Sequence, residues 1–154
     1  MDWLIGGALM AYSTDEDILD RLGRQKVQQL SDDDSTGHVN TQLLAAVREQ
    51  AARRINAKLR RRYDLPIEQE EAVELLADLE TDIVAYRLYA RRSTVEVPES
   101  VKDAKDDAWD EVKEIARHGG LGVDQDGDGA DDGGSTLQVR STDRETLRGK
   151  LQQF

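Results

Sequence analysis

Apolar residues recur at spacings of three and four in three long segments, residues 40–63, 68–92 and 97–120. This spacing puts the apolar side chains of a helix on one face and the polar side chains on the other. The pattern therefore predicts three long amphipathic helices that pack into a bundle. From each helix we expect two residues in the core: Val47, Ile55, Leu76, Ile83, Val112 and Ile115.

Local signals predict where these helices begin and end. Asn40 is a suitable N-cap for the first helix. The proline after Leu65 should end that helix, because a residue before proline disfavours helical backbone angles. Pro98 suits the first helical position of the third helix, and the pair Gly119 and Gly120 should end it.

A shorter helix precedes these three, in the sequence YSTDEDILDRLG. Ser13 and Glu16 have the spacing of a capping box, in which each side chain satisfies the other's backbone N–H. Gly23 is a natural stop for this helix. The sequence of residues 24–32 predicts one more short helical turn, which is followed by a polar loop.

Both ends of the chain look incomplete without a partner. Residues 1–11 are apolar but too few to cross a bilayer, so we expect an arm that packs on another surface. At the other end, an alternating segment precedes a short amphipathic helix that Thr142 and Glu145 would cap. The apolar residues of this expected docking arm are Leu137, Val139, Leu147, Leu151 and Phe154.

The expected fold class is all-α, a bundle of three long helices plus a short N-terminal helix. An extended C-terminal arm that ends in a short helix would follow the bundle. The expected parts are an N-terminal arm (1–11), a helical domain (12–123), an acidic spacer rich in Gly and Asp (124–134) and a docking arm (135–154).

The charge of the chain limits its partners. Its 154 residues carry a net charge of -11, which excludes a broad basic surface for nucleic acid. Aspartate outnumbers glutamate and arginine outnumbers lysine. This composition is typical of proteins from a high-salt cytoplasm, and it is also compatible with a GC-rich genome. The chain has no cysteine, so disulfides, cysteine–zinc sites and thiol nucleophiles are excluded.

The segment GVDQDGDGADDGG allows two interpretations. Its beginning matches the D-x-D-x-D-G start of a calcium loop, but Ser135 stands where such a loop needs a bidentate glutamate. The alternative is a self-repelling, solvated spacer. The ligands of a calcium site would be Asp124, Asp126, Asp128, Asp131 and Asp132.

A basic cluster lies at the end of the first long helix. It is an ordinary solvated helix end, or it contacts DNA or an acidic neighbouring subunit. Its arginines are Arg53, Arg54, Arg60, Arg61 and Arg62. The two histidines, His38 and His118, lack a metal-binding spacing, and no nucleophile motif is present. We therefore expect a protein that is not an enzyme and has no cofactor; Ca²⁺ would bind only if the Asp/Gly segment forms a cation site.

The order of motifs resembles the Mu-like phage head–tail adaptor family over roughly residues 12–124. One motif of that family, I-x-x-x-L-x-x-R-Y-x-L-P, is matched here by Ile55, Leu59, Arg62, Tyr63, Leu65 and Pro66. Another, D-I-x-x-Y-x-L-Y, is matched by Asp82, Ile83, Tyr86, Leu88 and Tyr89. The acidic segment and the tail after it are longer and more polar than the resemblance leads us to expect.

The resemblance implies a structural protein of the virion neck, at the head–tail junction, that is assembled in the host cytoplasm. Such adaptors form rings on the portal protein, and the resemblance implies about twelve copies; the ring form agrees with the rule that head-to-tail interfaces can close around an axis. The implied partners are the portal, reached by the C-terminal arm, and neck or tail completion proteins. DNA would pass through the channel without sequence-specific binding, and no membrane is involved. The acidic composition implies a tailed virus of a halophilic host.

Two other functions remain open on the residues alone. The chain is a calcium-regulated helical interaction module if the Asp/Gly segment holds a cation. It is a helical DNA-binding regulator if the cluster RRINAKLRRR contacts phosphates.

Overall fold

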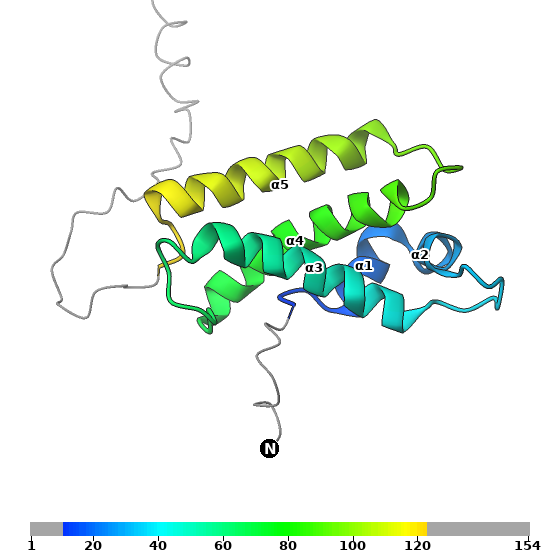
Figure 1. The fold of residues 1–154 in the computed structure, drawn as a ribbon, viewed down its shortest axis with the longest axis horizontal. Coiled ribbons are helices and arrows are strands. Elements are labelled where there is room, and N and C mark those ends of the chain that lie inside the picture. Colours follow the sequence, from blue (N-terminus) through cyan, green and yellow to red (C-terminus); the bar gives the residue numbers. More distant parts are fainter. Residues whose placement is uncertain (1–10, 123–154) are drawn as a thin grey trace, which may run out of the picture.

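The computed structural model of the protein describes residues 11–122. Within this range the chain forms five helices and no strand, which confirms the expected all-α fold (Figure 1). The helices are α1 (Asp15–Leu22), α2 (Arg24–Ser31), α3 (Thr41–Leu59), α4 (Glu70–Ala90) and α5 (Glu99–His118). Residues 1–10 of the expected N-terminal arm, the acidic spacer and the C-terminal docking arm lie outside the described residues.

The three long helices form the bundle. α4 packs against both α3 and α5 and runs antiparallel to them (Figure 1). α3 and α5 consequently run in the same direction, so their C-terminal ends lie at the same end of the bundle. The short helices α1 and α2 pack at the opposite end, beside the start of α3 and the end of α4.

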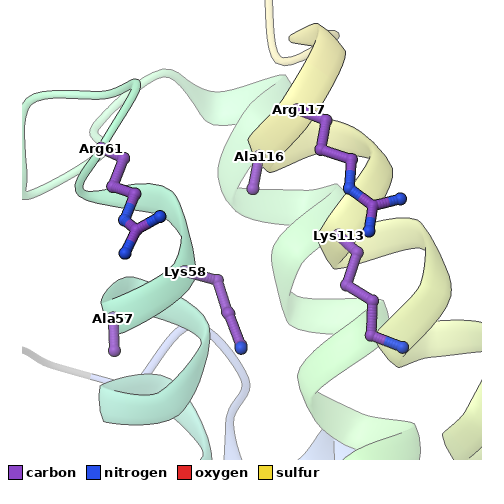
Figure 2. Close-up of a pocket in the computed structure, with 6 residues that line it drawn as sticks. All are labelled: Ala57, Lys58, Arg61, Lys113, Ala116 and Arg117. Atoms are coloured by element: carbon purple, nitrogen blue, oxygen red, sulfur yellow. The ribbon is translucent and has the colours of Figure 1, made fainter.

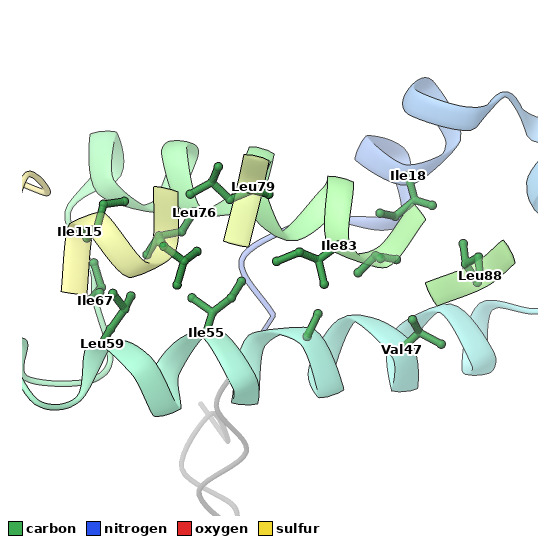
Figure 3. Close-up of a cluster of buried hydrophobic side chains, with 14 of the residues drawn as sticks. Ile18, Val47, Ile55, Leu59, Ile67, Leu76, Leu79, Ile83, Leu88 and Ile115 are labelled. Carbon is green, nitrogen blue, oxygen red and sulfur yellow. The ribbon is translucent and has the colours of Figure 1, made fainter. Parts of the chain in front are cut away.

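All six residues predicted for the core are buried, from Val47 at 9% exposed to Leu76 and Val112 at 0%. Figure 3 shows Val47, Ile55, Leu76, Ile83 and Ile115 within the buried cluster. Full burial of such a side chain contributes about 1.5–3 kcal/mol, so these faces hold the bundle together. The short helices and connections complete the same core with Ile18, Val27, Leu30, Tyr63, Ile67 and Leu121.

The capping box of α1 forms one residue later than predicted. Thr14, not Ser13, is the N-cap: its Oγ1 accepts a hydrogen bond from the backbone N–H of Asp17 at 3.2 Å. The Asp17 carboxylate in turn accepts one from the N–H of Thr14 at 2.6 Å. The sequence STDED contains both boxes, and tertiary contact selects between them because buried Ser13 hydrogen-bonds to Glu80 of α4.

The prediction for the end of α3 is wrong by several residues. The helix ends at Leu59, and the backbone N–H groups of Arg62 and Tyr63 both donate to its carbonyl oxygen in a closing turn. This turn directs Tyr63 into the core, where it is 4% exposed. The helix is therefore ended by packing well before Pro66 is reached.

The other boundaries are closer to the predictions. The Asn40 side chain caps α3, accepting from the N–H of Leu43 at 3.0 Å. Pro98 is the N-cap of α5 instead of its first helical residue. Gly119 ends α5 with φ +85°, a left-handed conformation that favours glycine.

Candidate interaction surface

The C-terminal part of α3 and the turn after it form a strongly basic surface. From Arg53 to Arg62 the chain carries six cations and no acidic residue. All six side chains are exposed, and none of them pairs with an acidic side chain in residues 11–122. This surface contains every arginine of the basic cluster that the sequence singled out.

A groove runs between the C-terminal ends of α3 and α5 (Figure 2). Its volume is about 490 Å³. We call it the basic groove, because two cations from each side line it, together with two alanines: Lys58, Arg61, Lys113, Arg117, Ala57 and Ala116. Arg53, Arg54, Arg60 and Arg62 are not part of its lining.

The two sides of the basic groove differ in how their charge is compensated. Lys113 lies 2.7 Å from Asp110, and Arg117 lies 3.5 Å from Glu114, both pairs within α5. These pairs are exposed, and such pairs contribute only about 0–1 kcal/mol. Lys58 on α3 and Arg61 in the turn after it have no such partner in the described range. The partial negative charges at the two helix C-termini offset some of the repulsion among the four cations.

Arg62 joins the two sides of this end of the bundle. Its guanidinium donates a hydrogen bond from Nη1 to the backbone carbonyl oxygen of Arg117, at 3.1 Å. Gly119 packs directly beside it, since a Cβ at that position would lie 3.2 Å from Arg62 Nε. Arg62 is therefore a structural residue, in contrast to its neighbours Arg60 and Arg61.

The basic end of α4 has a different role, although its sequence looks similar. Arg92 pairs with Asp33 at 2.9 Å and donates to the backbone carbonyl oxygen of Asp32 at 2.8 Å. Arg91 also pairs with Asp33, and this contact lowers the pKa of the Asp33 carboxyl below its usual value. These arginines hold the loop after α2, so their charge is used within the fold.

A buried carboxylate holds the beginning of the described chain. Glu80 is 0% exposed and accepts hydrogen bonds from the backbone N–H groups of Tyr12, at 3.0 Å, and Ser13, at 3.2 Å. Burial raises the pKa of Glu80, while these hydrogen bonds and nearby Arg48 oppose the rise. Burial and the Glu80 charge also raise the pKa of Tyr12 to about 12.

Glu80 was not among the residues predicted from the sequence. One signal was present, because Glu80 lies four residues after Leu76 and three before Ile83, on the apolar face of α4. A carboxylate in that position needs hydrogen-bond donors from elsewhere in the fold. Since it is already engaged by Tyr12 and Ser13, its role is to anchor the N-terminal segment.

The predicted calcium ligands lie outside the described residues, and residues 11–122 contain no group of acidic or histidine side chains that could hold a metal ion. His38 and His118 are both exposed, and His118 lies in the last turn of α5, as expected. No helix in the described part is long and apolar enough to cross a membrane.

The family model described as "Bacteriophage Mu, Gp36" matches residues 12–139, which is most of the chain. The chain belongs to the bacteriophage Mu Gp36 family. This membership supports a Mu-like phage protein with a structural or morphogenetic role. The Gp36 match contains both motifs noted in the sequence and extends past residue 124, so it includes the acidic segment. No curated protein matches the chain.

Proposed function

We propose that this Gp36-family protein is the head–tail adaptor of a tailed phage, with a structural and non-catalytic role. It forms a closed ring of about twelve copies between the portal and the neck or tail completion proteins. DNA passes through the ring without sequence-specific binding. The net charge of -11 favours this passage, because a negative protein does not retain DNA over a broad surface.

The observation that carries the proposal is the separation of opposite charges onto two faces of the helical bundle. Arg53 and Arg60 are seven residues apart, so they share one side of the α3 end, and both are exposed. Exposed acidic residues follow one face of α5 at spacings of three and four. These are Asp103, Asp106, Asp107, Asp110, Glu111 and Glu114.

Two different faces of this kind suit a head-to-tail interface. The basic face of one subunit meets the acidic α5 face of the next, and repeating the same contact around an axis closes a ring. Arg61 lines the basic groove and Arg62 binds the backbone of Arg117, so Arg53, Arg54 and Arg60 are the arginines left for this contact. Of these, Arg53 and Arg60 share one side of the helix end and are the pair chosen for charge reversal.

The remaining parts of the proposal rest on the family and the composition. The C-terminal arm, residues 135–154, docks on the portal with its apolar residues. The protein is located in the virion neck and is present in the host cytoplasm during assembly. Its aspartate-rich, lysine-poor composition points to a halophilic host.

Charge reversal tests the ring. Native mass spectrometry and electron microscopy of the purified chain, alone and with its portal, should show a closed ring of about twelve copies. The variants R53E/R60E and D103R/D107R should each disperse the ring, because each brings like charges together at the contact. Combining all four changes in one chain should restore it, because the charges are complementary again.

Arg24→Glu is the matched control. Arg24 is also exposed but lies on α2, away from both faces, so its reversal should leave the ring intact. A single isolated copy at the neck of assembled particles would contradict the proposal, and so would a ring unaffected by either double reversal.

A further inference from the structure

The basic groove carries positive charge that the described residues do not neutralise. Lys58 and Arg61 have no acidic partner in the part of the chain that the structure describes, and Lys113 and Arg117 share only exposed pairs along α5. In a chain with a net charge of -11, four cations around one groove form an exceptional surface. Such a groove attracts an extended anionic segment.

An anionic segment leaves the fold at this same place. α5 ends at His118, and the chain turns at Gly119 beside Arg62. Leu121 is 5% exposed and packs in the core, so the point where the acidic segment begins is held at the groove end of the bundle. Asp124 follows three residues after Leu121.

The sequence of this segment complements the groove. Residues 124–132 contain five aspartates, and no Lys or Arg occurs between Gly119 and Val139. An extended residue spans about 3.3–3.6 Å, so nine residues reach across the ends of two neighbouring helices. Because the segment is tethered a few residues away, its effective concentration at the groove is of the order of millimolar. An anion from another molecule must compete with it.

We propose that the basic groove binds the acidic segment 124–132 of its own chain. The carboxylates of the segment bind Lys58 of α3, Arg61 of the turn after it, and Lys113 and Arg117 of α5. Bound in this way, the segment keeps the groove from retaining DNA phosphates. The contact lies within a single chain, so it goes beyond the adaptor role and does not depend on ring formation.

Carbodiimide cross-linking tests which anion occupies the groove. This reagent joins a lysine amine directly to a carboxylate that touches it, and mass spectrometry identifies the joined peptides. The reaction is run on a dilute equal mixture of unlabelled and ¹⁵N-labelled full-length chains. Lys58 and Lys113 should be joined to residues 124–132, and both peptides of each cross-link should carry the same isotopic label. The yield should fall several-fold in about 1 M salt, because salt screens the attraction between the charges.

Lys102 is the matched control, because it lies on α5 outside the groove and pairs with Glu99. It should not be joined to the segment. Cross-links that combine the two isotopic labels would overturn the proposal in favour of the segment of a second copy. Equal yields at Lys102 and Lys113, or no cross-link to the segment, would show that the groove does not select it.

DNA binding provides a second measurement. The variant D124N/D126N/D128N/D131N/D132N should bind a short duplex about tenfold more tightly than wild type at low salt, because the groove is then free for phosphates. Adding K58Q and R61Q to this variant should return its DNA affinity to the wild-type level. A variant with the same five aspartates replaced by glutamate keeps its negative charge and should bind DNA no more tightly than wild type. Unchanged binding by the Asn variant, or a gain that K58Q and R61Q leave intact, would overturn the proposal.

Discussion

Ser13 donates its backbone N–H to Glu80, 3.2 Å away and 67 positions further along the chain. The Ser13 hydroxyl donates to the same carboxylate, and these two bonds fix where α1 begins, because they take Ser13 away from helix capping and leave Thr14 as the N-cap. They also give a fully buried carboxylate hydrogen-bond donors, so they connect the start of the described chain to the middle of α4.

Glu80 should make the stability of the protein depend on pH in an unusual direction. Its pKa is raised by burial, so the folded protein binds this proton more tightly than the unfolded chain does. The protonated form therefore stabilises the fold at low pH, and this contribution is lost as pH rises from about 4 toward the raised pKa. The free energy of unfolding of wild type minus that of Glu80→Gln should fall with rising pH.

Urea denaturation of both proteins at several pH values measures this difference. The subtraction cancels the other carboxylates, which otherwise dominate acid unfolding. Glu80→Leu serves as a second variant. It leaves the Ser13 and Tyr12 donors without an acceptor, so it should lower the unfolding free energy by about 2–4 kcal/mol at neutral pH. A difference that stays constant with pH would contradict the assigned pKa shift.

Gly119 and Arg62 should be coupled energetically. Gly119→Ala introduces a Cβ at φ +85° and 3.2 Å from Arg62 Nε. Gly37→Ala is the matched control, with φ +81° and open space around it. We expect Gly37→Ala to lower the free energy of unfolding by about 1 kcal/mol, because alanine is strained at a positive φ. Gly119→Ala should lower it by more.

Thermal denaturation of both variants, in wild-type and Arg62→Ala backgrounds, measures the part of the stability loss that is due to the contact between the new Cβ and Arg62. The additional cost at Gly119 should disappear when Arg62 is truncated, because only Arg62 must move to admit the Cβ. Equal losses at Gly37 and Gly119 would mean that Arg62 is not held in place by its bond to Arg117.

The C-terminal arm and the Asp/Gly segment should differ in their effect on assembly. Deleting residues 135–154 should leave the helical bundle folded, since the described core uses none of them, but should prevent incorporation into particles. The variant D124N/D126N/D128N should assemble nearly normally. Circular dichroism verifies the fold and particle composition verifies the assembly. If the D124N/D126N/D128N variant fails to assemble while the deletion variant assembles normally, the Asp/Gly segment is an essential cation site.

Salt should stabilise the protein if its host is halophilic. The net charge of -11 produces repulsion that screening removes, since the Debye length falls from about 10 Å at 0.1 M to about 3 Å at 1 M salt. The melting temperature should rise continuously between 0.1 M and 2 M KCl, well past the range needed for simple screening. A melting temperature that levels off near 0.3 M would favour an ordinary bacterial host.

The sequence alone determined the features that depend on neighbours three or four residues away. The apolar faces of α3, α4 and α5, the Asn40 cap and the Gly119 stop were all predicted correctly, because helix periodicity and capping are local properties. The family motifs around Tyr63 and Tyr86 were readable for the same reason, since they are short patterns in fixed order.

Only the tertiary structure decided how distant residues meet. The basic ends of α3 and α4 look alike in sequence, yet Arg91 and Arg92 are used inside the fold while Arg53 and Arg60 remain unpaired within residues 11–122. The parallel course of α3 and α5 creates the basic groove, and Glu80 selects Thr14 over Ser13 as a cap. Each outcome depends on packing and charge between segments far apart in the chain, and no local pattern carries that information.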